Sequence, residues 1–232
     1  MDPASCLIHA EFPNNILKKT SYSEGDLQTI DPSEVYVKYT ATYKTKPVKH
    51  CHIENACSFA YMEGDRVVVV TSTQIPHIVR HVIAQALGIP FGRVRVVKPY
   101  VGGGFGNKQD VIYEPLNAFL TMQVGGRCVR LDMNREENFL STRTRHGIEF
   151  QLETEVAKDG KILTRRSKAI SNQGGYASHG HTIVANATSG YRNLYHQNAL
   201  RQEAITVYTN ICSGGAMRGY GIPQINFAME SH

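Results

Sequence analysis

The chain has 232 residues, 41% of them hydrophobic, so it is long enough to bury one large core or two small ones. Its 25 basic and 20 acidic side chains are spread along the sequence and leave a formal net charge of +5, without the basic and aromatic stripe of a nucleic-acid-binding surface. No apolar run approaches the ~18 residues of a membrane span, no signal peptide is recognisable, and the five cysteines form no C-x-x-C pair, so we expect a cytoplasmic protein with reduced thiols and no membrane partner.

The first half of the chain predicts strands around one good helix. Residues 1–30 have little periodicity and predict a linker or an edge segment, so we expect the folded domain over residues 31–232. The alternation in VYVKYTATY, from Val35, predicts a half-buried strand, and the continuous run RVVVVTST, from Arg66, predicts a buried one. The next segment, PHIVRHVIAQALG, has helical spacing, a proline allowed in its first turn and a glycine able to end it.

Strands and helices continue to alternate beyond this helix. RVRVVKP predicts a strand, a glycine-rich loop follows, and Pro115 to Val124 predicts a second helix that ends at two glycines. RCVRLDMN predicts a further strand, and the segments on either side of Asp159-Gly160 predict a long hairpin. This order is typical of an α+β fold with mixed sheets and packed helices.

The glycine-rich loop, GGGFG from Gly102 to Gly106, places bare backbone directly after an apolar strand. Glycine loses more conformational freedom on folding than any other residue, so something must be gained there. A strand, this loop and a helix could hold a phosphate, as in dinucleotide folds, although Asn107 occupies the third glycine position of G-x-G-x-x-G. A non-catalytic nucleotide- or phosphate-binding module is therefore one hypothesis, and a turn that needs positive φ is the structural alternative.

Two other loops also end apolar runs and expose one polar or aromatic side chain. TSTQIPH places Gln74 between a strand and a helix, and GGAMRGYGIPQ carries Arg218 and Tyr220 in a glycine-flanked turn. Three such loops are typical of a grip on one large polar ligand. TSTQIP, VGGGFGNK and AMRGYGIPQ, in this order and spacing, resemble the molybdopterin-binding large subunit of molybdenum hydroxylases, the xanthine dehydrogenase and aldehyde oxidase family. The resemblance runs from about Val35 to His232 and is strongest to bacterial xanthine dehydrogenase molybdenum subunits.

The resemblance implies a molybdenum–molybdopterin site. Gln74 matches the family glutamine that approaches the molybdenum oxo ligand, Phe105 the aromatic residue beside the metal, and Arg218 the arginine near the cofactor oxygens. These three side chains around molybdenum would line one shared cleft, where bare glycine backbone lets the pterin dithiolene approach closely. The expected cofactor-binding residues are Gln74, Gly103, Gly104, Phe105, Gly106 and Arg218.

The substrate side of this site departs from the purine-oxidising members of the family. Gln109 stands where animal xanthine-oxidising enzymes carry a substrate-binding glutamate, and Asn186 falls where they carry an arginine. Amides can still donate to and accept from a heterocycle. Tyr220 matches the aromatic wall over the substrate. The resemblance therefore implies a purine or another N-heterocyclic substrate, with an aldehyde as the second choice.

The resemblance also implies that the chain is a fragment, the first lobe of an incomplete subunit. In the family the general-base glutamate belongs to a G-x-G-E-type segment of a later domain, and nothing in this sequence matches it. We therefore expect no catalytic residue here and no turnover by the fragment itself. The expected partners are the remaining domains of the same subunit, with iron–sulfur clusters and FAD on partner subunits or domains.

Two other groups of polar residues have structural explanations. The group His50, Cys51, His52 and Cys57 lacks the ligand spacing of a zinc site, so buried or surface side chains are favoured over metal binding. The stretch from Arg143 to His146 predicts a solvated charged segment after a helix, with phosphate binding as its alternative.

Overall fold

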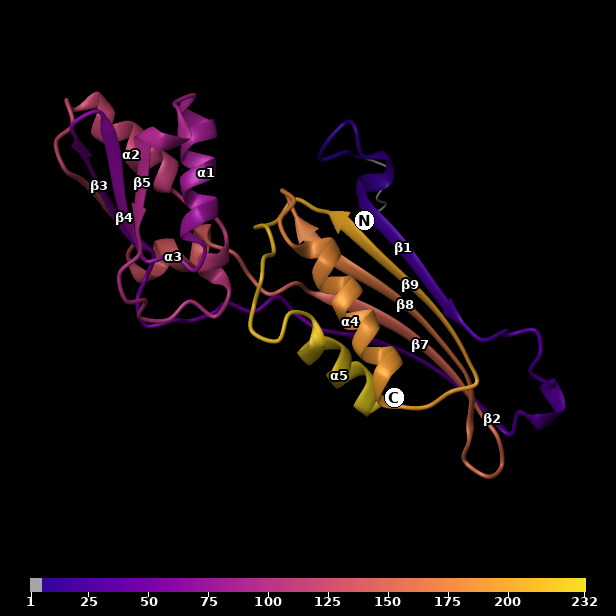
Figure 1. Ribbon diagram of the computed structural model, residues 1–232. Coiled ribbons are helices and arrows are strands. Elements are labelled where there is room, and N and C mark those ends of the chain that lie inside the picture. Colours follow the sequence, from indigo (N-terminus) through magenta and orange to yellow (C-terminus); the bar gives the residue numbers. More distant parts are fainter. Residues whose placement is uncertain (1–5) are drawn as a thin grey trace. The chain divides into compact units, whose positions relative to one another are not determined.

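The computed structural model describes residues 6–232, which divide into two compact units (Figure 1). The five-stranded unit contains the residues up to Val48 together with Thr144–His232, and the four-stranded unit is Lys49–Arg143. Each unit is a mixed sheet covered by helices, so the predicted α+β class is confirmed. Within residues 6–232, none of the helices combines the length and apolar character needed to cross a bilayer.

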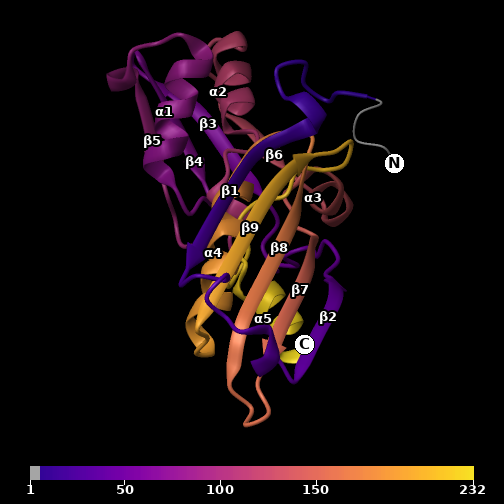
Figure 2. The same cartoon turned by 90° about the vertical axis from the view of Figure 1, so that its right-hand side faces the viewer.

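The five-stranded sheet has the spatial order β1-β9-β8-β7-β2 (Figure 2). Only β8 and β9 run parallel, and the other neighbours pair antiparallel. Its strands are β1 (Ile16–Glu24), β2 (Val37–Lys44), β7 (Ile148–Val156), β8 (Ile162–Gly174) and β9 (Ala199–Tyr208). Short 3-10 helices cover Pro13–Asn15 and Pro32–Glu34. Because β1 lies at the sheet edge, this unit includes residues on both sides of position 30, and the domain boundary expected there stays a prediction.

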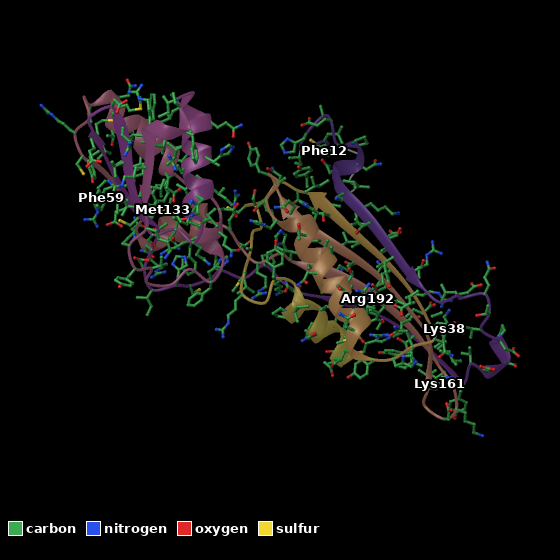
Figure 3. The ribbon with its side chains drawn as sticks, viewed as in Figure 1. Phe12, Lys38, Phe59, Met133, Lys161 and Arg192 are labelled. Atoms are coloured by element: carbon green, nitrogen blue, oxygen red, sulfur yellow. The ribbon has the colours of Figure 1, made fainter. Side chains whose placement is uncertain are left out.

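Two helices, α4 (Gly180–Leu194) and α5 (Ile222–Ser231), pack on this sheet. The core between them is built from Ile148, Phe150, Leu152, Ala169, Val184, Ala187, Tyr191, Leu200, Ala204, Ile225, Ala228 and Met229. Alternate residues of β7 point to the other face, where the ammonium of Lys38 lies 3.1 Å from the Glu153 carboxylate. Figure 3 labels Lys38, which belongs to β2. That face carries charged side chains of β2 and β7, whereas the core and both helices occupy the opposite face.

The four-stranded sheet has the order β5-β4-β3-β6. Its strands are β3 (Cys57–Glu63), β4 (Arg66–Thr71), β5 (Val94–Val97) and β6 (Val129–Asp132), and its helices are α1 (Pro76–Leu87), α2 (Glu114–Gln123) and α3 (Arg135–Ser141). The parallel strands β4 and β5 are joined through α1 and the 3-10 helix Phe91–Arg93. Ala60, Val67, Val69, Val79, Ile83, Ala84, Val94 and Ala118 form the core.

The local signals in the sequence place several boundaries correctly. Helix α1 has its proline in the first turn and ends at Gly88, whose φ of +63° is left-handed, as predicted. The hairpin between β7 and β8 turns at Gly160, with φ +88°. The second helix also lies where it was predicted: α2 begins at Glu114, and a 3-10 helix, Asn107–Gln109, lies between it and the glycine loop.

Candidate functional site

The glycine-rich loop leaves β5 and turns sharply before the 3-10 helix. Backbone φ is +106° at Gly103, +53° at Phe105 and +108° at Gly106, all in the left-handed region that glycine adopts most easily. A Cβ added to Gly104 would lie 2.5 Å from Oε1 of Gln74. The bare backbone therefore serves two needs, an unusual chain path and the close approach of a glutamine side chain.

The middle of this loop presents amides that no acceptor among residues 6–232 uses. At its two ends, the N–H of Gly102 donates to Oε2 of Glu54 at 2.8 Å, and the N–H of Gly106 donates to Oε1 of Gln74 at 3.0 Å. The three amides between them meet no acceptor in the part of the chain that the structure describes; they belong to Gly103, Gly104 and Phe105. Successive free amides in such a loop suit an anionic or oxygen-rich ligand.

Gln74 lies between β4 and α1 and is half-buried. Its backbone N–H donates to the carbonyl of Lys108 at 2.9 Å. Because the N–H of Gly106 can only donate, it must face the oxygen of the Gln74 amide, which turns the NH2 group away from the loop backbone. Among residues 6–232 that NH2 group has no acceptor, so Gln74 offers a donor to a ligand.

Phe105 and Gln109 lie on the same loop and its 3-10 helix. The Phe105 side chain is 48% exposed. Gln109 is half-buried; its backbone N–H donates to the carbonyl of Gly106 at 3.0 Å, while its side chain has no hydrogen bond within the described residues. Both side chains are therefore available to a ligand.

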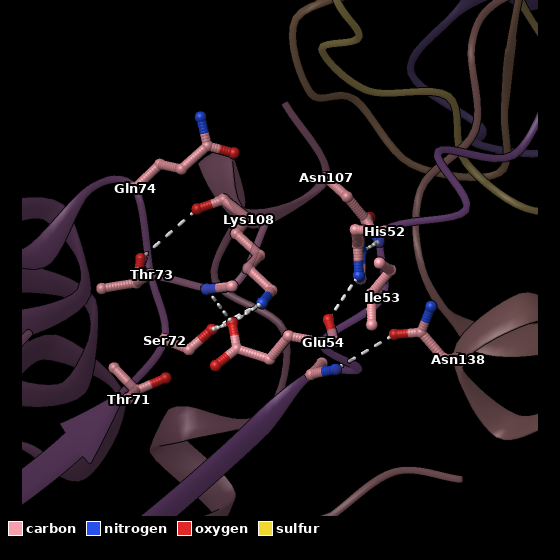
Figure 4. A network of polar contacts seen from close by, with 12 residues as sticks. His52, Ile53, Glu54, Thr71, Ser72, Thr73, Gln74, Asn107, Lys108 and Asn138 are labelled. Carbon is pink, nitrogen blue, oxygen red and sulfur yellow. Dashed lines mark hydrogen bonds and ion pairs between the residues drawn. The ribbon is translucent and has the colours of Figure 1, made fainter. Parts of the chain in front are cut away.

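A buried ion pair lies beside the loop (Figure 4). The ammonium of Lys108, only 2% exposed, donates to Oε2 of Glu54 and to Oγ of Ser72, each at 2.5 Å. Burial raises the pKa of the Glu54 carboxyl, but hydrogen bonds from Lys108, Ser72 and Gly102 outweigh it, so the pKa lies below its ordinary value. The carboxylate therefore stays ionised opposite the ammonium at neutral pH.

Asn107 connects the loop to the end of α3. Its Oδ1 accepts from the N–H of Arg143 at 3.1 Å, and its Nδ2 donates to Oγ1 of Thr142 at 3.1 Å. Thr142 in turn donates to the carbonyl of Asn138, whose Oδ1 accepts from the N–H of Ala56 at 3.2 Å. This chain of bonds holds the loop, α3 and the start of β3 together.

His52 is fully buried next to these residues. Its Nδ1 lies 2.5 Å from the carbonyl of Glu54, and its Nε2 lies 2.9 Å from Nδ2 of Asn107. Because the carbonyl only accepts and the amide NH2 only donates, His52 is neutral and carries its proton on Nδ1. Burial lowers its pKa, the charges of Lys108 and Arg135 add to this effect, and the bond to Glu54 opposes it. The protein itself thus uses both ring nitrogens.

The turn before α5, in the five-stranded unit, repeats the backbone pattern of the loop. Backbone φ is +88° at Gly219, +47° at Tyr220 and +98° at Gly221. A Cβ on Gly221 would lie 2.4 Å from the carbonyl oxygen of Ile183. The side chain of Arg218 is exposed at the start of this turn, so its guanidinium is accessible to a ligand.

Arg145 and Gln224 support this turn. Nη2 of Arg145 donates to the carbonyl of Arg218 at 2.7 Å, and Nη1 donates to Oε1 of Gln224 at 3.1 Å. Gln224 donates to the carbonyl of His146, which is 1% exposed. Burial lowers the pKa of Arg145. The expected solvated segment is therefore wrong for Arg145 and His146. Arg145 holds the backbone of the turn, and His146 is buried with its Nε2 3.2 Å from Oε1 of Gln173.

Asn186 and Tyr220, both predicted to contact substrate, contact each other. Nδ2 of Asn186, on α4, donates to the carbonyl of Tyr220 at 2.7 Å. The Tyr220 hydroxyl lies 3.1 Å from Nδ1 of His179, at the N-terminus of α4. Asn186 thus supports the turn, and its contact with substrate stays a prediction.

The structure places the predicted site residues in two groups. Those of the four-stranded unit are Gln74, Gly103, Gly104, Phe105, Gly106 and Gln109; those of the five-stranded unit are Asn186, Arg218 and Tyr220. The shared cleft expected for Gln74, Phe105 and Arg218 stays a prediction. The sequence interpretation missed the supporting residues Glu54, His52 and Arg145. No local signal identifies Glu54, because its partner Lys108 lies 54 positions away in the sequence.

Residues 8–232 match the family model for the molybdopterin cofactor-binding domain. The chain is 48% identical over 219 residues to the xanthine dehydrogenase molybdenum-binding subunit of Escherichia coli, which covers 94% of this chain and 29% of that subunit. It is 33% identical over 231 residues to the nicotinate dehydrogenase large molybdopterin subunit of Eubacterium barkeri, covering 99% and 53%. The solved aldehyde oxidoreductase from Desulfovibrio gigas superposes with a TM-score of 0.89 at 26% identity, over 95% of this chain and 24% of that one. The chain therefore belongs to the molybdopterin cofactor-binding domain family.

Proposed function

We propose that the chain is part of the molybdenum-binding subunit of a molybdenum hydroxylase that oxidises a purine or a related N-heterocycle with oxygen derived from water. The observation that carries this proposal is the donor array of the glycine loop. Three successive amides, from Gly103 to Phe105, and the NH2 group of Gln74 have no acceptor within the described chain. A large, oxygen-rich cofactor satisfies such donors together.

The residues present fit a molybdenum–molybdopterin cofactor. Gln74, Phe105 and the loop glycines would hold it from the four-stranded unit, where a Cβ at Gly104 would displace the Gln74 amide. The exposed guanidinium of Arg218 offers several fixed donors to oxygen atoms, which a lysine would not reproduce. When bound, the cofactor supplies the two-electron oxidation of the substrate carbon.

Gln109, Asn186 and Tyr220 are the residues we assign to substrate. The names of the two relatives, xanthine dehydrogenase and nicotinate dehydrogenase, refer to flat nitrogen heterocycles, and the structural neighbour is an aldehyde oxidoreductase. The side chain of Gln109, which has no hydrogen bond to the described residues, offers a donor and an acceptor to a ring edge. An aldehyde is the second substrate class.

Gln109→Glu in the complete enzyme tests the substrate assignment. The substitution replaces a donor by a charge, so the ratio of kcat/KM between two purines should change by about two- to tenfold, the effect of one hydrogen bond. Steady-state kinetics with xanthine and hypoxanthine measures this ratio. If both substrates lose the same factor, Gln109 does not contact the ring.

The activity requires more protein than this chain. The chain spans 29% of the xanthine dehydrogenase subunit that it resembles. We assign the general-base glutamate to the remaining domains of the same subunit, and the iron–sulfur clusters and FAD to partner subunits or domains, all in the cytoplasm. The 232-residue chain alone should therefore turn over no substrate.

A nucleotide-binding module built on the glycine loop is not favoured. Such a module needs a helix N-terminus at the phosphate. Here α2 begins at Glu114, and the buried carboxylate of Glu114 already accepts from the N–H groups of Ile112 and Tyr113, at 2.9 and 3.1 Å. Its other oxygen accepts from Thr71 at 3.0 Å. The anion position of this helix is therefore filled by the protein.

The decisive experiment uses the complete subunit that carries this chain, produced with its partners. Elemental analysis should find molybdenum, and a purine incubated in ¹⁸O-labelled water should gain the label. Gly104→Ala should lower the molybdenum content because it displaces Gln74, whereas Gly92→Ala, where an added Cβ meets nothing within 4 Å, should not. A metal-free wild-type subunit would contradict the proposal, as would hydroxylation by the 232-residue chain alone.

A further inference from the structure

One carboxylate oxygen joins three chain segments around the glycine loop. Oε2 of Glu54, just before β3, accepts from Nζ of Lys108 at 2.5 Å, from Oγ of Ser72 at 2.6 Å and from the N–H of Gly102 at 2.8 Å (Figure 4). Ser72 leaves β4, Gly102 begins the loop and Lys108 follows it. We call Glu54, Ser72 and Lys108 the loop clamp.

The loop clamp is connected to Gln74 on both sides, through the backbone after Ser72 and through the backbone around Lys108. Gln74 lies two residues after Ser72, and its backbone N–H donates to the carbonyl of Lys108 at 2.9 Å. Its side-chain oxygen accepts from Gly106, which lies two residues before Lys108. Movement of either Ser72 or Lys108 therefore shifts a bond that orients the Gln74 amide.

The charges of the loop clamp suit a positional role better than a stabilising one. The Lys108 side chain is 2% exposed and that of Glu54 is 34% exposed. Removing an ammonium from water costs free energy, and the attraction to its carboxylate partner roughly offsets that cost. A buried ion pair therefore adds little net stability to the fold, but it constrains the positions of the two side chains. Its three short bonds to one oxygen make that geometry specific.

We propose that Glu54, Ser72 and Lys108 are positioning residues that hold the NH2 group of Gln74 toward the bound cofactor. This inference rests on the proposed function, which assigns Gln74 to the molybdopterin site. The ammonium of Lys108 is engaged by Glu54 and Ser72 and is almost fully buried, so the loop clamp acts through Gln74 and not by contact with the ligand.

A double-mutant cycle between Lys108 and Gln74 tests this inference. The readout is the rate at which molybdenum leaves the complete, cofactor-loaded subunit during dialysis, followed by elemental analysis. Gln74→Ala should accelerate release by about three- to tenfold, the equivalent of one hydrogen bond, and Lys108→Met by a similar factor. The double variant should release molybdenum no faster than the faster single variant, because both substitutions remove the same contact.

Two more variants keep the test interpretable. Ser72→Ala removes one bridging hydroxyl but leaves the ion pair, so it should accelerate release by about twofold in a folded subunit, again without adding to Gln74→Ala. It replaces Lys108→Met if that variant does not fold. Lys98→Met removes an exposed lysine that directly follows β5, before the glycine loop, and it should leave the release rate unchanged.

Three results would overturn the inference, and they differ in their wider consequence. If the effects of Lys108→Met and Gln74→Ala multiply, the loop clamp is only structural, while the assignment of Gln74 stands. If Gln74→Ala leaves the release rate unchanged, both the clamp inference and the assignment of Gln74 to the cofactor are wrong. A wild-type subunit without molybdenum removes the proposed function itself.

Discussion

The glycine loop and the turn before α5 share the same left-handed backbone conformations, but side chains of opposite hydrogen-bonding type hold them in place. In each, an aromatic residue with left-handed φ precedes a left-handed glycine: Phe105 and Gly106 at +53° and +108°, Tyr220 and Gly221 at +47° and +98°. Such residues cost free energy and persist only where the surroundings hold them. The two supports can therefore be compared directly.

Around the loop, side-chain acceptors hold backbone N–H groups. Glu54 accepts from Gly102, and the oxygen of Gln74 accepts from Gly106. Around the turn, side-chain donors hold backbone carbonyls, as Arg145 does for Arg218 and Asn186 for Tyr220. Acid protonates the two groups beside the loop, the carboxylate of Glu54 and the neutral imidazole of His52. It does not change the charge of the groups that hold the turn, the guanidinium of Arg145 and the amide of Asn186.

The largest effect should follow from Glu54→Gln, which leaves the buried ammonium of Lys108 without its counter-charge. We expect a loss of about 3 kcal/mol in the free energy of unfolding of the four-stranded unit, the low end for a broken buried ion pair because Glu54 is partly exposed. Urea unfolding at pH 7.5 measures it. The control Glu63→Gln, in an exposed pair with Arg95, should lose less than about 1 kcal/mol. Equal losses in the two variants would show that leaving the ammonium of Lys108 without its carboxylate partner costs no more than breaking an exposed ion pair.

The second largest loss of stability should follow from Gly221→Ala, in the turn before α5. The alanine meets both an unfavourable φ of +98° and the Ile183 carbonyl 2.4 Å from its Cβ, so we expect a loss of about 2 kcal/mol in the five-stranded unit. Gly160→Ala is the matched control, because its φ is +88° but nothing lies within 4 Å of the added Cβ. It should lose about 1 kcal/mol. Similar losses in thermal unfolding would mean that the turn moves freely away from α4.

The smallest effect is the pH dependence contributed by His52. Its pKa is lowered on folding, so the unfolded chain binds the proton more tightly, and stability present above the ordinary value of about 6.5 is lost as the pH falls below it. Glu54, also with a lowered pKa, adds its loss only below about 4.5.

His52→Gln isolates this contribution, because glutamine can accept from Asn107 but does not titrate. The variant should be about 1 kcal/mol less stable at pH 7.5, for the lost bond to Glu54, yet should lose less stability than wild type between pH 7 and pH 5. Urea unfolding at several pH values measures both. The control His77→Gln, at an exposed position, should keep the wild-type slope. A wild-type slope in His52→Gln would assign the acid sensitivity to other groups.

Local sequence signals determined those parts of the fold whose causes lie within a few residues. The first-turn proline and Gly88 bound α1, and Asp159-Gly160 bounds the β7–β8 hairpin, because proline and glycine restrict or free the backbone wherever they stand. The three loop motifs were sufficient to indicate the family, since their residue types and spacing are unusual together. Weaker patterns gave less: residues 1–30, which contain the edge strand β1, predicted a linker or an edge segment, and β9 was not predicted.

Only the tertiary structure decided how the loops are held, because the partners are far apart in the sequence. Lys108 meets Glu54 across 54 positions, and Arg145 reaches the Arg218 carbonyl across 73. Composition made Arg145 and His146 resemble solvated charges, and only the tertiary structure showed that Arg145 supports a turn and that His146 is buried. A sequence specifies short-range backbone preferences residue by residue, whereas the pairing of buried polar groups depends on which strands and loops the whole fold brings together.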